Sequence, residues 1–162
     1  MKITQLPSEH WLEYKKLRLE AVQDSPQSFL ATVEETEAET DAEWQDKIKN
    51  MLFAVNEAGE LVGMVGVYSD RKVKLKHIAN IVSVYVKPDY RGQGIGKKLL
   101  EAALTSAKAN PEIAKIQLGV ITTQDAARHL YKSLGFKKVG ELKRAVKIGD
   151  TFYDEHLMEI LL

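Results

Sequence analysis

Residues 84–97 have the sequence VYVKPDYRGQGIGK, in which an apolar segment is followed by three glycines at alternate positions. Pro88 ends the apolar segment, so we expect a strand over Ile78–Val86. Glycines let the backbone adopt unusual dihedral angles and let a ligand approach it closely. Apolar residues at helical spacing continue to Leu104, so the stretch predicts a strand, a glycine turn and a helix in succession.

The glycine turn has the features of an anion site. The first N–H groups of the following helix lack partners within the helix and carry partial positive charge, and Arg91 and Lys97 flank the turn. A pyrophosphate group suits such a site. A nucleoside-triphosphate loop would need glycine at Arg91 and Ser or Thr at Lys98, and a dinucleotide fingerprint would need glycine at Lys97. Both motifs are therefore excluded, and a tight turn without a ligand is the remaining alternative.

The other segments alternate between strand and helix patterns. Thr40 and Glu43 form a capping-box pattern that begins a helix. We expect strands at 2–6, 52–55, 61–68, 78–86, 116–121, 136–142 and 152–160, and helices at 8–24, after 40, from 96 to 109 and at 125–134. This order predicts a mixed α/β (α+β) fold, with a mostly antiparallel sheet flanked by helices and a central βαβ unit. No linker or repeat interrupts it, so we expect a single domain over residues 1–162.

Composition narrows the function classes. The 162 residues include no cysteine, which excludes disulfides, thiolate metal sites and a cysteine nucleophile. The four histidines lack ligand spacing, so we expect no metal. The formal net charge of zero argues against nucleic-acid binding. Neither a membrane-spanning apolar stretch nor a signal peptide is recognisable, so we expect a cytoplasmic protein that binds no membrane.

The zero net charge conceals an uneven distribution. Residues 1–60 contain 6 basic and 13 acidic side chains, whereas residues 61–149 contain 17 basic and 6 acidic ones. Residues 150–162 contain 4 acidic side chains and no basic one. The basic middle contains the glycine turn and suits an anionic ligand. The acidic ends favour a cationic second ligand through electrostatic steering.

Two motifs resemble those of one known family. Residues 86–96 (VxPxxRGxGIG) resemble the acetyl-CoA signature of the GNAT superfamily of N-acetyltransferases, and residues 127–136 (AxxLYxxLGF) resemble the next motif of that family. The expected order of strands and helices also fits the family fold, so the resemblance covers nearly the whole chain.

The resemblance implies where acetyl-CoA binds as co-substrate. Backbone groups of Val84, Tyr85 and Val86 would pair with the pantetheine arm, and N–H groups near Val84 would polarise the thioester carbonyl. Gln124 stands where the family often has an asparagine that contacts this arm. The pyrophosphate would be held by the backbone N–H groups of Arg91, Gly92, Gln93, Gly94, Ile95, Gly96 and Lys97.

The resemblance also implies a general acid. Tyr131 stands where the family often has a tyrosine that protonates the departing thiolate, and packing beside Leu130 and Leu134 is the alternative. Many relatives carry an acidic base near the positions of Val82 and Ser83, which this chain lacks. The base therefore stays unknown. The alternatives are a water held by Ser83 or Asn80, or one of the side chains His77, Glu34, Glu35, Asp154 and His156.

The resemblance implies a transferase that moves acetyl from acetyl-CoA to a primary amine by direct attack. A small cationic amine is favoured as acceptor, and a protein N-terminus or a lysine side chain stays open. A catalytically lapsed acyl-CoA-binding or regulatory module is the alternative, and an adapter that uses its acidic helix is a third. Family members frequently dimerise, and Phe152–Ile160 could pair across a homodimer interface.

Overall fold

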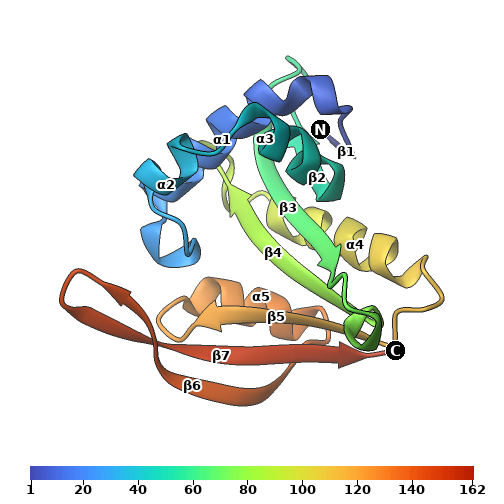
Figure 1. Ribbon diagram of the computed structural model, residues 1–162, viewed down its shortest axis with the longest axis vertical. Coiled ribbons are helices and arrows are strands. Elements are labelled where there is room, and N and C mark those ends of the chain that lie inside the picture. Colours follow the sequence, from blue (N-terminus) through green and yellow to red (C-terminus); the bar gives the residue numbers. More distant parts are fainter. The chain divides into compact units, whose positions relative to one another are not determined.

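The computed structural model describes all 162 residues and contains seven strands and five α-helices (Figure 1). The strands are β1 (Lys2–Thr4), β2 (Met51–Val55), β3 (Leu61–Ser69), β4 (Ile78–Val86), β5 (Lys115–Ile121), β6 (Lys137–Ile148) and β7 (Thr151–Leu161). The helices are α1 (Trp11–Asp24), α2 (Val33–Glu37), α3 (Asp41–Lys47), α4 (Ile95–Lys108) and α5 (Asp125–Ser133).

One sheet contains the strands in the order β1-β2-β3-β4-β5-β7-β6. The β4–β5 pair is parallel, whereas β1–β2, β2–β3, β5–β7 and β6–β7 are antiparallel. A parallel pair needs a crossover connection, which α4 supplies. This confirms the expected mixed α/β fold with a mostly antiparallel sheet and a central βαβ unit.

The contacts between residues divide the chain into two compact units. The first unit contains Met1–Val67 and Ser83–Ala103, and the second contains Tyr68–Val82 and Leu104–Leu162. Both β4 and α4 contribute residues to each unit.

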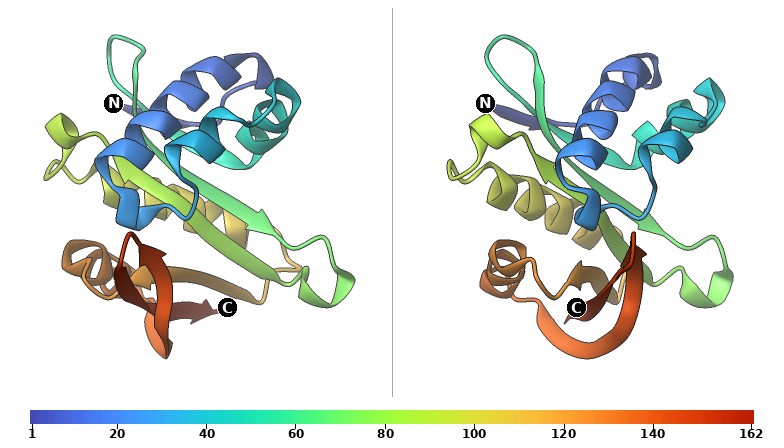
Figure 2. Two further views of the ribbon diagram at one scale, coloured as in Figure 1. Left: turned by 60° about the vertical axis from the view of Figure 1, so that its left-hand side comes forward. Right: turned by 90° about the vertical axis from the view of Figure 1, so that its left-hand side faces the viewer.

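In the first unit, helices cover both faces of β2 and β3. Figure 2 shows α1, α2 and α3 on one face and the beginning of α4 on the other. On the α1 face, the Tyr14 ring makes edge contacts with Trp44 (5.1 Å between centroids) and Phe53 (5.5 Å). On the α4 face, a Cβ at Gly63 would lie 2.9 Å from the Tyr85 carbonyl oxygen and 3.0 Å from a Leu99 methyl. Glycine therefore allows β4 and α4 to approach β3 closely.

Local capping interactions explain where α2 and α3 begin. The Thr40 side chain accepts a hydrogen bond from the Glu43 N–H, and the Glu43 carboxylate accepts one from the Thr40 N–H, as the sequence predicted. Thr32 and Glu35 form a second box of the same kind that begins α2. That short helix was not expected, although its sequence pattern is the same.

In the second unit, apolar side chains alternate along β5, and α5 lies beside that strand (Figures 1 and 2). Ile116, Leu118 and Val120 are buried, as are Tyr131 and Met158. The hairpin of β6 and β7 confirms the expected last two strands, but β6 continues to Ile148 and does not end at Leu142.

The extension of β6 passes through an irregularity between Leu142 and Val146. Arg144 has a φ of 52°, and its N–H donates to Asp154 Oδ1 (2.8 Å). A positive φ interrupts the regular alternation of side chains along a strand. The sequence around Arg144 therefore lacks the alternating apolar pattern that predicts a strand.

None of the helices is both long enough and apolar enough to cross a bilayer.

Candidate active site

The second half of β4 contains a strained residue. Ser83 has a φ of 56°, which is rare for a residue with a Cβ. Such a backbone conformation costs free energy and persists only where contacts with the surrounding structure enforce it. Arg18 on α1 holds it, because Arg18 Nη1 donates to Ser83 Oγ at 2.7 Å. The guanidinium also lies over the Phe29 ring, 4.4 Å from its centroid. A side chain of α1 therefore supports the positive-φ backbone of Ser83, immediately before Val84–Val86.

Arg18 is the residue of this region that our reading of the sequence missed. It makes no ion pair, and burial lowers its pKa from the usual value of arginine. The hydrogen bond to Ser83 spans 65 positions in the chain. No local pattern signals such a contact.

The glycine turn presents a row of open hydrogen-bond donors. A short 3-10 helix (Pro88–Tyr90) leads from β4 into it, and Gly92 and Gly94 have φ values of 74° and 76°. The N–H groups of residues 92–97 donate to no acceptor within the protein. Consecutive open N–H groups at a helix N-terminus form an anion-binding concavity. The expected anion site therefore has the donor set that a pyrophosphate requires.

Arg91 differs from the other residues that were predicted from the sequence to bind the pyrophosphate. Its N–H donates to the Pro88 carbonyl at 3.1 Å, Nε donates to the Val86 carbonyl at 2.9 Å, and its guanidinium pairs with Asp24 at the end of α1. Partial burial works to raise the pKa of Asp24, but the hydrogen bonds from Arg91 and Ser25 hold it below its usual value. Arg91 thus links the end of β4 to α1, whereas exposed Lys97 approaches only Glu101, at 3.9 Å.

In the second unit, Tyr131 lies on α5 with 7% of its surface exposed and makes an edge contact with Phe136 (6.0 Å). Burial raises its pKa to about 12, so the phenol is protonated at neutral pH. Its hydroxyl makes no hydrogen bond within the protein and is available as a donor. Gln124 occupies the N-cap position of α5, and its N–H donates to the Ile121 carbonyl at 3.0 Å.

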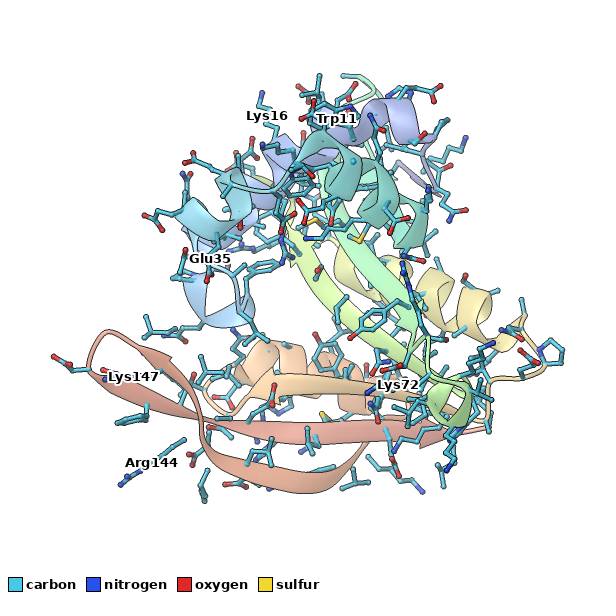
Figure 3. The ribbon with its side chains drawn as sticks, viewed as in Figure 1. Trp11, Lys16, Glu35, Lys72, Arg144 and Lys147 are labelled. Atoms are coloured by element: carbon cyan, nitrogen blue, oxygen red, sulfur yellow. The ribbon has the colours of Figure 1, made fainter.

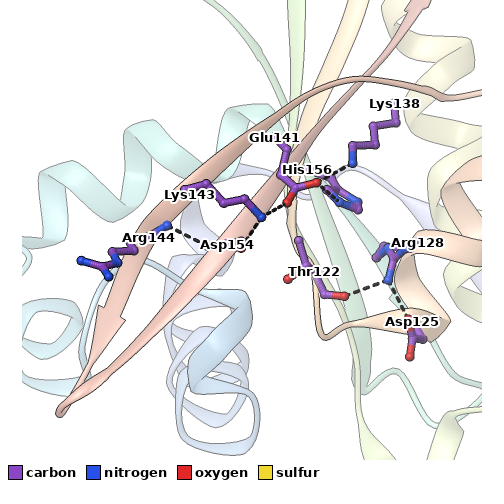
Figure 4. A network of polar contacts seen from close by, with 9 residues as sticks. All are labelled: Thr122, Asp125, Arg128, Lys138, Glu141, Lys143, Arg144, Asp154 and His156. Atoms are coloured by element: carbon purple, nitrogen blue, oxygen red, sulfur yellow. Dashed lines mark hydrogen bonds and ion pairs between the residues drawn. The ribbon is translucent and has the colours of Figure 1, made fainter.

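Two of the expected base candidates belong to a network of ion pairs on β6 and β7 (Figure 4). Asp154 accepts hydrogen bonds from the Arg144 N–H and from Lys143 Nζ (2.9 Å), and His156 Nε2 lies 3.1 Å from Glu141 Oε2. Hydrogen bonds from Lys138 and Lys143 lower the pKa of Glu141 to about 2. Asp154 and His156 are therefore engaged with other side chains.

The remaining base candidates lie elsewhere. Glu35 caps α2 at the surface of the first unit (Figure 3), and Glu34 is exposed beside it. His77 is exposed immediately before β4. Asn80 Oδ1 accepts a hydrogen bond from Gln117 Nε2 at 2.8 Å. The structure therefore gives none of these residues the surroundings of a general base, such as partial burial with an unoccupied acceptor atom.

The strand, glycine turn and helix, within a mixed sheet that contains one parallel pair, are characteristic of an acetyltransferase fold. Residues 16–136 match the acetyltransferase (GNAT) family, and the chain belongs to that family.

Individual relatives agree with this assignment. The chain is 32% identical over 100 residues to the N-alpha-acetyltransferase RimI of Mycobacterium tuberculosis. The match covers 61% of this chain and 60% of RimI, so it spans less than two thirds of that relative's length.

Solved structures match over nearly the whole chain. A GNAT acetyltransferase from Streptococcus pneumoniae superposes with a TM-score of 0.84 and 25% identity, covering 99% of this chain and 98% of its own. The fold is also that of yncA from Salmonella typhimurium, solved with its cofactor acetyl-CoA (TM-score 0.85, 19% identity, 100% of this chain and 94% of yncA).

Proposed function

We propose that this protein is an N-acetyltransferase that moves acetyl from acetyl-CoA to a primary amine. The observation that carries the proposal is the row of open N–H groups over residues 92–97, at the junction of β4 and α4. Membership of the GNAT family and the fold shared with the acetyl-CoA complex of yncA support it.

Each part of acetyl-CoA has a proposed partner. The pyrophosphate binds the N–H groups of residues 92–97 and the Lys97 ammonium, with the helix dipole adding about 1 kcal/mol. The pantetheine arm follows the backbone of Val84–Val86, which comes directly after the positive-φ residue Ser83 and beyond the β4–β5 pairs at Ile78–Asn80. Gln124 contacts the same arm. Arg91 acts through its ion pair with Asp24, which fixes the entrance to the turn.

The chemistry is direct transfer. The amine nitrogen attacks the thioester carbonyl carbon, the C–N bond forms, and the C–S bond breaks as the thiolate leaves. Tyr131 donates its proton to the thiolate. Its raised pKa keeps that proton in place at neutral pH until a strong acceptor develops. N–H groups near Val84 stabilise the oxyanion.

The domain and cellular context are proposals as well. Both compact units would form one acetyltransferase domain over residues 1–162, in the cytoplasm. The expected homodimer pairing through Phe152–Ile160 is wrong, because β7 lies between β5 and β6 in the sheet and Glu155–Glu159 already pair with both of these strands. The acidic segments 1–60 and 150–162 favour a small cationic acceptor. The lack of a carboxylate at Val82 and Ser83 favours the second candidate, an acyl-CoA-binding module without turnover.

Gly94→Glu tests the proposal, because it places a carboxylate among the open N–H groups. We expect acetyl-CoA to stabilise the wild type in a melting assay and this variant to lose that stabilisation, together with CoA-thiol release on a panel of amines. Gly59→Glu is the matched control, since Gly59 also has a positive φ (85°) and open space around it but lies in the β2–β3 turn. Full activity in Gly94→Glu would overturn the cofactor placement. Stabilisation of the wild type without thiol release from any amine would favour the second candidate.

A further inference from the structure

The second unit contains a hollow of about 290 Å³ on the face of β4, β5 and β7 that α5 does not cover. Strand register explains its position, because Gln117 pairs with Glu159, Gly119 with Leu157 and Ile121 with Glu155. Side chains at these positions point away from the buried face that holds Ile116, Leu118 and Val120. The volume suits a small ligand group.

Gly119 lines the hollow, and the Glu155 side chain occupies the space that a side chain at Gly119 would take. A Cβ at Gly119 would lie 2.2 Å from Glu155 Oε1 and 2.7 Å from Glu155 Cδ. Glycine in the middle of a strand weakens it and often marks a close approach. Here it allows the carboxylate of β7 to lie across β5.

Glu155 is the charged group of the hollow that has no partner. Lys115 and Glu159, the other charged residues that line the hollow, pair with each other at 2.7 Å, and Asn80 and Gln117 hydrogen-bond to each other at 2.8 Å. The Glu155 side chain makes no hydrogen bond or ion pair within the protein, although the residue is half-buried. Removing a carboxylate from water without a compensating partner is costly, so the arrangement suits a cation from outside.

The rest of the lining suits an alkyl chain. Val82, Val139 and Leu157 contribute apolar surface beside the carboxylate, and Tyr68 is the remaining titratable residue of the lining. A negative group at one end of a small, partly apolar hollow matches a primary alkylammonium ion, because the ammonium pairs with the carboxylate and the alkyl chain covers the apolar side chains.

We propose that this hollow receives the acceptor amine, and that Glu155 binds its ammonium group and accepts its proton. The inference rests on the proposed acetyltransferase function. One proton passes from the ammonium nitrogen to the Glu155 carboxylate and later to solvent. The freed lone pair attacks the thioester carbonyl carbon, the C–S bond breaks, and the thiolate takes the Tyr131 proton. The nitrogen then releases its second proton to solvent, and the Tyr131 phenolate takes one proton back from solvent, which leaves the acetamide, CoA thiol and one released proton overall.

Two variants test the assignment by different routes. Glu155→Gln removes the charge, and Gly119→Ala keeps it but displaces the carboxylate, since the new methyl group meets only the flexible end of Glu155. We expect both to lower kcat/KM for linear primary alkylamines about 100-fold and to leave the stabilisation by acetyl-CoA unchanged. Glu155→Asp should recover part of the rate. Glu112→Gln, at an exposed position between α4 and β5, is the control for loss of one negative charge and should match the wild type.

The pH profile and the stability distinguish this role from a structural one. In Glu155→Gln only the free amine reacts, so kcat/KM should rise about tenfold per pH unit below the pKa of the amine, and the wild type should show a shallower rise. The melting temperature of Glu155→Gln should equal or exceed that of the wild type, because an unpartnered half-buried charge is removed. Wild-type kcat/KM and an unaltered pH profile in both Glu155→Gln and Gly119→Ala would overturn this inference alone. Absence of turnover in the wild type with every amine would overturn the proposed function, and the inference with it.

Discussion

Arg18 Nη1 donates a hydrogen bond to Ser83 Oγ at 2.7 Å and thereby connects the middle of α1 to the second half of β4. Ser83 has a φ of 56°, so its backbone needs external support. The Phe29 ring beneath the guanidinium provides a second contact, and Phe29 also packs against Tyr85 of β4 with 6.3 Å between ring centroids. Arg18 is therefore a positioning residue for the strand that we propose to bind the pantetheine arm.

Arg18→Met should lower the free energy of unfolding by about 2 kcal/mol, because it removes a charge-assisted hydrogen bond in a half-buried place. It should also weaken acetyl-CoA binding, since the positive-φ backbone of Ser83 loses its support from α1. Urea unfolding and calorimetric titration with acetyl-CoA measure the two effects. Lys16→Met, at an exposed position on the same helix, should change neither. An Arg18→Met variant as stable as Lys16→Met would show that the backbone of Ser83 keeps its conformation without Arg18.

Tyr131→Phe should lower kcat about 100-fold and leave acetyl-CoA binding unchanged. Phenylalanine retains the edge contact with Phe136, so the packing of α5 is preserved while the proton donor is lost. Steady-state kinetics with saturating acetyl-CoA give kcat, and the melting temperature checks the fold. An unchanged kcat would remove Tyr131 from the chemistry and leave it as a packing residue.

Alkaline pH should destabilise the protein between pH 10 and pH 12. Burial raises the pKa of both Tyr14 and Tyr131 from 10.0 to about 12. Below pH 10 both phenols are protonated in the folded and the unfolded chain, so their contribution to stability is complete. Between pH 10 and pH 12 the unfolded chain loses these protons while the folded chain keeps them, which favours unfolding by on the order of 3 kcal/mol per residue.

Urea unfolding at a series of pH values, with tyrosinate absorbance as a second signal, checks this prediction. Tyr131→Phe and Tyr14→Phe should each make the decline shallower, because each removes one of the two groups. A decline of equal steepness in both variants would mean that other groups cause the alkaline unfolding.

Much of the fold was predictable from short stretches of sequence. The segment from Ile78 to Lys97 gave strand, turn and helix correctly, because Pro88 ends pairing and glycines permit the positive φ values found at Gly92 and Gly94. The capping box at Thr40 placed the start of α3. The end of β6 was placed too early, because the positive φ of Arg144 depends on a hydrogen bond to Asp154, ten positions away.

Some features of the candidate site could likewise be predicted from short stretches of sequence, and others could not. The open N–H groups of the glycine turn and the position of Tyr131 on α5 follow from the sequence by itself, since backbone dihedral angles and hydrogen bonds between near neighbours determine them. The partners of the charged side chains do not. Arg18 with Ser83, Arg91 with Asp24, and Glu155 beside Gly119 join residues 65, 67 and 36 positions apart. Only the tertiary structure decided these pairs, because packing brings distant segments together and thereby determines which charges are neutralised and which, like Glu155, stay open to a ligand.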